Sequence, residues 1–436
     1  MYKYHTDEFG HQITVTNNID ISEFDEFEMV SLLAEAREIE GPIMFEVGVG
    51  GSVSTTPIIK DGVVYFGSND KKMYATDAKT GRILWSFSAE EPIMSEAVIY
   101  ENKIYFGSYD KCIYCLDLNG NLIWKFPTQG KIAVKPETVD NKLFIGSEDG
   151  NIYCLDTETG QLIWKFPTQG PVIGCPVHHE GRIYVGSNDY NFYCLSVDGY
   201  EIWKFRAGGE IIFNSIVVDD VVYFGCFDSN FYAVTTEGDL VWKIPITEAI
   251  NSFIAYSDGV LYFGSRNYNC YAVTTEGDIL WEFKTNNIHG SGISVYENVI
   301  FFGSCDNNLY CNDKKTGKLI WKFPTKGIVV CTNPAVYKNK VYFGSWDCHL
   351  YCLSLNGELI WKFPTSLSYS APVNLELNKN YKKTLEVVWN AEPTRTDDDK
   401  YKEKVRTEQG FGGYGDFDTG YKMSTSYLGK KKKRYG

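Results

Sequence analysis

The sequence lacks the features that would place the protein in a membrane or mark it for export. No run approaches the ~18 consecutive apolar residues of a membrane-spanning helix. The first residues, Met1 to Gly10, lack the basic and then apolar pattern of a signal peptide. Positive charge is also scarce, because 42 Lys and Arg face 56 Asp and Glu, which gives a net charge of −14. That balance argues against general nucleic-acid binding, which needs clustered basic residues. We expect a cytoplasmic protein whose twelve cysteines are reduced thiols.

What the sequence does contain is an internal repeat. The segment Val64-Tyr65-Phe66-Gly67-Ser68 returns in related form seven more times, 39 to 41 residues apart. A tryptophan follows the glycine of each copy by 17 or 18 residues: Trp85, Trp124, Trp164, Trp203, Trp242, Trp281, Trp321 and Trp361. Turn residues divide each unit into four short strands, which in the first unit are expected at 54–59, 63–67, 73–77 and 83–87. This period predicts an all-β fold, an eight-bladed β-propeller of four-stranded antiparallel blades.

The third strand of each unit explains many of the cysteines. A tyrosine there is followed by alanine or cysteine, as in Tyr74-Ala75 and Tyr153-Cys154. Because the two residues replace each other, the position requires a small buried side chain. Five cysteines are therefore expected to be packing residues: Cys115, Cys154, Cys194, Cys311 and Cys352.

One run within the repeat resembles the signature of the pyrroloquinoline-quinone (PQQ) repeat, found in propellers similar to quinoprotein alcohol dehydrogenase. It reads Tyr-x-x-Asp-x-x-Thr-Gly-x-x-x-Trp and stands in the first unit as Tyr74, Asp77, Thr80, Gly81 and Trp85. It recurs from Tyr153 to Trp164 and from Tyr310 to Trp321, while the other copies keep only the turn. The resemblance covers about Gly51 to Thr365 and implies that the eight tryptophans pack between neighbouring blades and lock the ring.

The resemblance also bears on activity. The dehydrogenases of this family share an adjacent Cys-Cys pair, an inner tryptophan beneath the quinone and calcium-ligating acids. This chain has no adjacent cysteines, and Trp346 and Trp389, which lie outside the repeated series, do not fall on an expected inner strand. Lipoprotein relatives without a cofactor carry an export signal and a lipid-attachment cysteine, and neither pattern occurs here. We therefore expect the non-catalytic branch, with no cofactor and no metal.

Alternating strand direction decides which loops share a face of the propeller. The turns between the second and third strands (the B–C turns) lie with the connections between blades, and we call this side the B–C face. Its turns vary, and five carry aromatic side chains suited to partner binding: Tyr109, Tyr190, Phe227, Tyr268 and Trp346. The alternative is that these rings pack on neighbouring blades. An aspartate recurs in the same turns of seven blades, and we interpret it as a turn cap, not a metal ligand.

Other candidate groups have structural explanations. Glu96 and Lys135 fall on adjacent inner strands at the central channel, where an ion pair is more often structural than catalytic. Three motifs resemble metal ligands: Cys112-x-x-Cys115, Cys348-His349 with Cys352, and His178-His179. Residues three apart on a strand point to opposite faces, which argues against the first. We expect a metal at none of them.

The two ends fall outside the repeat. Residues 1–50 form an N-terminal extension in which Ser22 caps a helix running to about Ile39. Residues 51–390 are the propeller with closing strands. A further inner strand, strand A, is expected near Ser370–Val373 and another near Thr384–Trp389, and Ile13–Val15 is expected to join them. Residues 391–436 are charged, then rich in Gly and Tyr, and end in the basic cluster Lys430–Arg434, which predicts a disordered tail.

These observations favour a monomeric, non-enzymatic scaffold that binds a protein through its B–C face. One alternative is an oxidoreductase that binds a quinone or another small ligand in the channel. Another is an RNA- or ribosome-associated protein that contacts nucleic acid through its basic tail.

Overall fold

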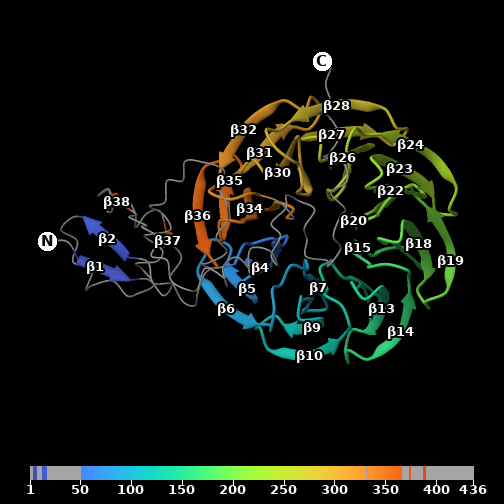
Figure 1. Ribbon diagram of the computed structural model, residues 1–436, viewed down its shortest axis with the longest axis horizontal. Coiled ribbons are helices and arrows are strands. Elements are labelled where there is room, and N and C mark those ends of the chain that lie inside the picture. The colour runs from blue at the N-terminus through green and yellow to red at the C-terminus, as the bar shows by residue number, and fades with distance from the viewer. Residues whose placement is uncertain are drawn as a thin grey trace, which may run out of the picture. The chain divides into compact units, whose positions relative to one another are not determined.

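The computed structural model divides the chain into two compact units, Gly41–Lys382 and a second unit made of Met1–Glu40 and Lys383–Gly436. The structure describes residues 51–329 and 332–365 in full, and the backbone of residues 3–6, 12–16, 373–374 and 386–388. Within these ranges no helix is present that is long and apolar enough to cross a membrane. The first unit is a ring of eight blades, each built from four consecutive antiparallel strands (Figure 1). The predicted eight-bladed propeller is confirmed.

Strands A to D run from the inside to the outside of each blade. Strands A are β3 (Ile58–Lys60), β7 (Val98–Tyr100), β11 (Glu137–Val139), β16 (Val177–His179), β21 (Ile216–Val218), β25 (Ala255–Ser257), β29 (Ile293–Tyr296) and β33 (Ala335–Tyr337). Strands B are β4 (Val63–Gly67), β8 (Lys103–Gly107), β12 (Lys142–Gly146), β17 (Arg182–Gly186), β22 (Val221–Gly225), β26 (Val260–Gly264), β30 (Val299–Gly303) and β34 (Lys340–Ser345).

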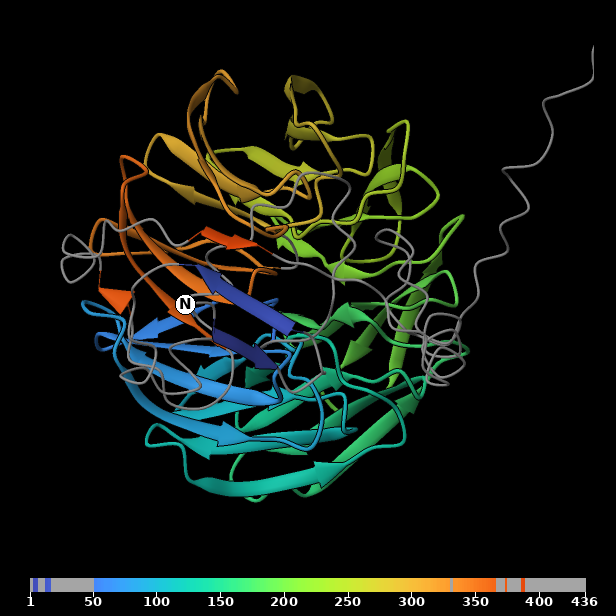
Figure 2. The same ribbon diagram turned by 60° about the vertical axis from the view of Figure 1, so that its left-hand side comes forward.

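Strands C are β5 (Lys72–Asp77), β9 (Cys112–Asp117), β13 (Asn151–Asp156), β18 (Asn191–Ser196), β23 (Asn230–Thr235), β27 (Asn269–Thr274), β31 (Asn308–Asp313) and β35 (His349–Ser354). Strands D are β6 (Ile83–Ser88), β10 (Leu122–Pro127), β14 (Leu162–Pro167), β19 (Glu201–Arg206), β24 (Leu240–Pro245), β28 (Ile279–Lys284), β32 (Leu319–Pro324) and β36 (Leu359–Pro364). Strands D lie on the perimeter, and blades follow one another in chain order from blue to orange (Figures 1 and 2).

Burial along the strands reflects their place in the blade. Strands B and C each contain at least four consecutive buried residues, because neighbouring blades cover both faces of these strands. In strand D, exposed and partly buried residues alternate from the tryptophan onward. Most outer strands place a lysine at the centre and a proline at the end, as in Lys125 and Pro127 of β10. Such residues discourage another strand from pairing with the open edge.

The inner strands are shorter than the sequence suggests. Strand A of the first blade was expected at 54–59 and is found at Ile58–Lys60. The difference has a local cause, because the Thr55 hydroxyl takes the place of a ladder contact. It accepts a hydrogen bond from the Gly67 amide and donates one to the Gly67 carbonyl, both at 2.9 Å. Side-chain contacts therefore replace backbone pairing at the inner end of this blade.

The ring closes without strand exchange between the first and eighth blades. Val53 N donates to Ser345 O at 3.1 Å, and Tyr342 Oη donates to Ala78 O at 2.8 Å. The indole of each repeated tryptophan donates to a backbone carbonyl of the next blade, and Trp361 does so to Ala78 of the first blade. Its ring also lies against Gly81, whose φ of 72° is in the left-handed region that glycine adopts without strain. The eighth joint is thus built like the other seven.

The remaining strands refine the expectations for the ends. Val373–Asn374 (β37) pairs with β36 as a fifth, outermost strand of the last blade, so it is not the inner strand that was expected. In the second unit, β1 (Lys3–Thr6), β2 (Gln12–Thr16) and β38 (Glu386–Val388) form a small sheet. The helix expected from Ser22 and the basic cluster at 430–434 lie outside the described residues.

Candidate binding face

The B–C turns are fixed to the connections that enter and leave their blades. In the fourth blade, Asn188 N donates to Pro171 O at 2.9 Å, and Ile211 N donates to Ser187 O at 3.2 Å. The Ser187 hydroxyl also accepts a hydrogen bond from Asp189 N at 3.2 Å. Equivalent contacts recur around the ring, as between Tyr109 N and Pro92 O at 2.9 Å. The predicted sharing of one face by these turns and connections is therefore correct.

The repeated aspartate caps the turn and also joins two segments. Asp189 Oδ1 accepts from Asn191 N at 2.9 Å, while Oδ2 accepts from Tyr193 Oη at 2.6 Å and Gln169 N at 2.9 Å. These hydrogen bonds favour the ionised carboxylate and hold the pKa of Asp189 below its usual range, against the effect of burial. Gln169 belongs to the connection from the preceding blade. The turn-capping role of Asp189 is confirmed, and both of its carboxylate oxygens accept hydrogen bonds from donors of the protein.

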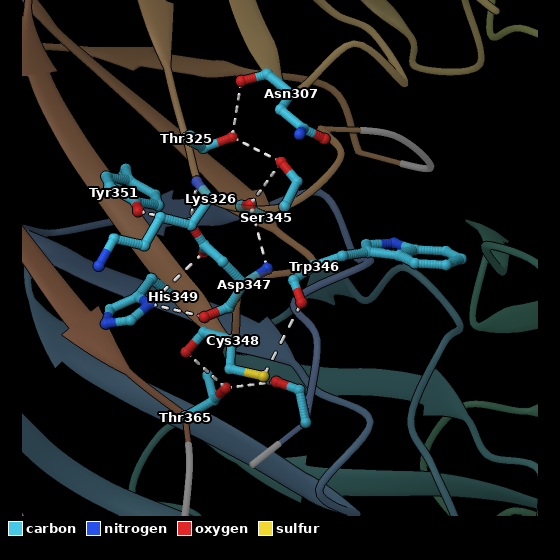
Figure 3. Close-up of polar contacts among 12 residues, drawn as sticks. Asn307, Thr325, Lys326, Ser345, Trp346, Asp347, Cys348, His349, Tyr351 and Thr365 are labelled. Atoms are coloured by element: carbon cyan, nitrogen blue, oxygen red, sulfur yellow. Dashed lines mark hydrogen bonds and ion pairs between the residues drawn. The ribbon is translucent and has the colours of Figure 1, made fainter. Parts of the chain in front are cut away.

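The eighth blade shows the same arrangement with a histidine added (Figure 3). Asp347 Oδ2 accepts from Tyr351 Oη at 2.7 Å and from Lys326 N at 2.9 Å. His349 Nδ1 lies 3.4 Å from Asp347 Oδ1, and this neighbour helps to hold the pKa of Asp347 below its usual range. The side chain of Trp346 extends away from this hydrogen-bonded group. Burial raises the pKa of the Cys348 thiol to about 12.

The five candidate aromatics differ in exposure. Tyr190 and Tyr268 are exposed at 39% and 40% of their surface. The other three, Tyr109, Phe227 and Trp346, are only partly exposed. Lys131 Nζ lies 4.8 Å from the ring centre of Tyr109. The structure thus places all five on the B–C face and presents two of them to solvent more fully than the rest.

The two exposed tyrosines also adopt an uncommon backbone conformation. Tyr190 has φ of 74° and Tyr268 has φ of 75°, in the left-handed region. The same turn position holds Lys71, Lys111, Gly150, Ser229, Asn307 or Cys348 in the other blades. A bulky aromatic residue is disfavoured in this conformation, which glycine and asparagine tolerate well. Aromatic side chains therefore occur there despite the backbone preference.

At the channel, side chains from different sides of the ring meet. Phe253 of the sixth blade packs against a cluster that includes Val134 and Cys175 of the third and fourth blades. Burial raises the pKa of Glu96, whose carboxylate accepts a hydrogen bond from Thr56. Lys135 acts on Glu96 only through its charge, because no ion pair within 4 Å joins them in residues 51–329 and 332–365. The suggested direct pair is therefore not formed.

One group of possible metal ligands lies where the A–B turns of neighbouring blades contact each other. His179, Glu180 and Asp220 bring their ligand atoms within 4.8 Å of one another on the opposite face. His179 Nε2 lies 3.6 Å from Asp220 Oδ1, and Lys60 with Asn102 (2.6 Å) makes the corresponding contact between the first two blades. The same A–B turns are linked in this way in several blades, so a metal is not needed to explain the cluster.

Three residues of interest were not identified from the sequence, although each differs from the residue that most other blades have at its position. Arg206 and Lys284 end strands D in blades four and six, where five other blades have proline. His289 stands where other blades have isoleucine or valine, as at Ile93 and Val172. Its imidazole is completely buried beside Gly264, and burial lowers its pKa to about 4.

Comparison with known proteins places the fold in a family. Residues 30–259 match the family described as "Beta-alanine-activating enzyme, beta-propeller", and residues 266–388 match "Outer membrane protein assembly factor BamB". No curated protein matches the chain.

Solved structures agree on the fold. BamB from Moraxella catarrhalis is 18% identical with a TM-score of 0.62, and the alignment covers 72% of this chain and 100% of that one. The quinohemoprotein alcohol dehydrogenase from Comamonas testosteroni is 14% identical with a TM-score of 0.59, and the alignment covers 71% of this chain and 75% of that one. The computationally designed Ika8 protein is 17% identical with a TM-score of 0.63, and the alignment covers 71% of this chain and 98% of that one. Because the first family match spans more than half of the 436 residues, the chain belongs to the PQQ-repeat β-propellers, in the family described as the beta-propeller of beta-alanine-activating enzyme.

Proposed function

We propose that the protein is a non-catalytic scaffold that binds a protein partner through its B–C face. The observation that carries this proposal is the pair Tyr190 and Tyr268, which are exposed at 39% and 40% in left-handed turn positions. All eight blades have the left-handed conformation at this turn position, so the two tyrosines are set apart by their size and exposure. Exposed tyrosines bury a large area on binding at a low cost in side-chain entropy.

The frame beneath these rings supports the same function. The capping carboxylate of Asp189 and the Ser187 hydroxyl hold the turn that carries Tyr190 at both ends. In the sixth blade Asn267 takes the place of aspartate, and its Oδ1 accepts from Asn269 N at 3.0 Å. A rigid turn loses little freedom when a partner binds, so more of the contact energy appears as affinity.

The channel offers less support for the alternative of a small-ligand oxidoreductase. Phe253 contacts the cluster around Val134 and Cys175, so side chains occupy this level of the channel. Likeness to the quinohemoprotein alcohol dehydrogenase is at 14% identity and concerns the fold alone. One of the matching families is named for an assembly factor, which is compatible with a binding role for this chain.

A capture experiment tests the proposal. The double variant Tyr190→Ser/Tyr268→Ser should fold normally and lose the partner that the wild-type protein retains from native extract. If each ring is an anchor worth ~2 kcal/mol, affinity falls by roughly 30-fold for each single change. Tyr200→Ser is the matched control, because Tyr200 is 74% exposed but lies in a C–D turn on the other face. Full retention by the double variant would contradict the proposal.

The three less exposed rings provide a second comparison. Changing Tyr109, Phe227 and Trp346 together to Ser tests whether they bind or pack. Loss of the partner with an intact fold would extend the binding surface to these blades. Unfolding of this variant would show that the three rings are structural, and would leave Tyr190 and Tyr268 as the anchors.

A further inference from the structure

Blades four and six share a second departure from the repeat. Their outer strands end in Arg206 and Lys284, whereas the corresponding residue is proline in five other blades and Ser88 in the first. These are also the two blades with a tyrosine at the left-handed turn position. Among the eight blades, a tyrosine at the left-handed turn position and a cation at the end of strand D occur together twice. Neither of them occurs at its position in a blade that lacks the other.

In the fourth blade the two side chains are in contact. The guanidinium carbon of Arg206 lies 5.0 Å from the ring centre of Tyr190, within range of a cation–π interaction. Arg206 Nη1 also donates a hydrogen bond to Asp189 O, which anchors the side chain to the turn. A guanidinium carries five N–H donors, so this single contact leaves most of them for another acceptor.

These residues border a hollow of about 540 Å³ between the third and fourth blades. Lys204 and Arg206 supply two cations to its wall, and Gln169 and Asn188 supply amides. The acids of the wall are engaged: Glu201 Oε1 lies 3.5 Å from Lys204 Nζ, and Asp189 accepts hydrogen bonds from the turn. Lys204 is paired with Glu201, so Arg206 is the cation of the wall that is available to a ligand. Its guanidinium also covers one face of the Tyr190 ring.

We infer that this hollow binds a carboxylate side chain from an acidic segment of the protein partner. The planar fork of Arg206 matches a carboxylate in the two-hydrogen-bond geometry that lysine cannot provide. Tyr190 holds the guanidinium in place and offers its ring edge to the aliphatic stem of the ligand. The inference rests on the proposed function and adds the chemistry of what is recognised. The pair Tyr268 and Lys284 provides a second cation for such a segment.

The test compares two synthetic peptides by isothermal titration. One is acetyl-Gly-Glu-Leu-Glu-Gly-amide, and the other has Gln in place of both Glu. We expect the full-length protein to bind the Glu peptide at least tenfold more tightly than the Gln peptide, with affinity falling as salt is raised. Equal affinities for the two peptides, or no binding of either, would overturn the inference. Free glutarate binding as tightly as the Glu peptide would also overturn it, because the site would then recognise small carboxylates.

Two variants assign the preference to the hollow. Arg206→Gln should remove the preference for the Glu peptide, whereas Lys322→Gln, an exposed lysine on a distant outer strand, should leave it unchanged. Arg206→Pro introduces the residue that the repeat has in five other blades, so it should fold and show the same loss. If partner capture still depends on Tyr190 and Tyr268 while the Glu preference is absent, the carboxylate site fails and the proposed function stands. If capture is independent of both tyrosines, the proposed function itself fails.

Discussion

The indole nitrogen of Trp361 donates a hydrogen bond of 3.3 Å to the carbonyl oxygen of Ala78, across 283 residues of the chain. The other seven tryptophans make the same contact with the blade that follows them, as Trp164 does with Val197 O at 3.1 Å. The tryptophan hydrogen bond that closes the ring is therefore the same contact that joins each pair of neighbouring blades. Its contribution to stability remains a prediction, and the eighth joint is the best place to measure it.

Trp361 is only 1% exposed, which makes it the most informative tryptophan to remove. Trp361→Ala should lower the free energy of unfolding by about 3–5 kcal/mol, because a large buried side chain is lost and a cavity remains. Trp164→Ala should cost less, since Trp164 is partly exposed. Denaturant unfolding measures both, with Tyr200→Ala as an exposed aromatic control. An unchanged midpoint for Trp361→Ala would show that the joint does not lock the ring.

The buried His289 predicts a specific dependence of stability on pH. Its pKa is about 4 in the folded protein, against an ordinary value of 6.5, because burial disfavours the charged imidazolium. The negative charge of Asp306 acts against this shift. Between these two values the unfolded chain binds a proton that the folded chain does not. The stability present above pH 6.5 should therefore be lost as pH falls towards 4, by at most ~1.4 kcal/mol per pH unit.

The matched variant is His289→Ile, which introduces a residue that other blades carry at this position. It should remove the part of the pH dependence between pH 6.5 and 4 and leave the remainder, which arises from carboxylates. Chemical unfolding at several pH values measures the difference. If the two proteins lose stability in parallel over this range, His289 is not buried as a neutral imidazole.

The cysteines of strand C should react slowly with thiol reagents. Cys154 and Cys194 are completely buried, and burial raises their pKa to about 12 and about 11 respectively. Thiolate, the reactive form, is scarce under these conditions. Cys305 is partly exposed and should be labelled before Cys154 and Cys194. Mass spectrometry of the native protein after brief labelling gives the order, and rapid modification of Cys154 would contradict its packing role.

The aspartate caps can be tested with a substitution that the chain itself contains. The sixth blade has Asn267 where other blades have aspartate, and Asn267 Nδ2 donates to Tyr271 Oη at 2.6 Å. Asp149→Asn should therefore be tolerated with a loss below about 1 kcal/mol, whereas Asp149→Ala should cost ~1–3 kcal/mol by leaving buried donors unpaired. Thermal unfolding of both variants makes the comparison. Equal losses would show that the hydrogen bonds do not carry the effect.

Much of the fold was predictable because the same pattern of strands and turns occurs in eight copies of the repeat. Strand B of the first blade was predicted at 63–67 and is found at Val63–Gly67. Strand A was predicted too long, because the hydroxyl of Thr55 replaces part of the ladder. The position of β37 was also wrong, since apolar alternation does not distinguish an inner strand from an added outer one. The short pairing of Gly174–Cys175 (β15) with Phe213–Asn214 (β20) depends on φ of 71° at Phe213, which nothing in the sequence indicates.

The candidate face was predictable as a location and less so in detail. Alternating strand direction placed the five aromatics on one side, but their exposure depends on neighbours that the sequence does not identify. Tyr190 and Tyr268 differ from the other three in their exposure, which is known only from the folded structure. The pairing of Tyr190 with Arg206 was visible in principle, because both depart from the repeat in the same blade.

The most direct test of the central claim is hydrogen–deuterium exchange on the purified protein with and without its captured partner. We predict slower exchange in the B–C turns at 187–191 and 265–269, which carry Tyr190 and Tyr268, and unchanged exchange in the A–B turns on the opposite face. Protection confined to the A–B turns, or to the chain outside the propeller, would contradict the proposal that the B–C face is the binding surface.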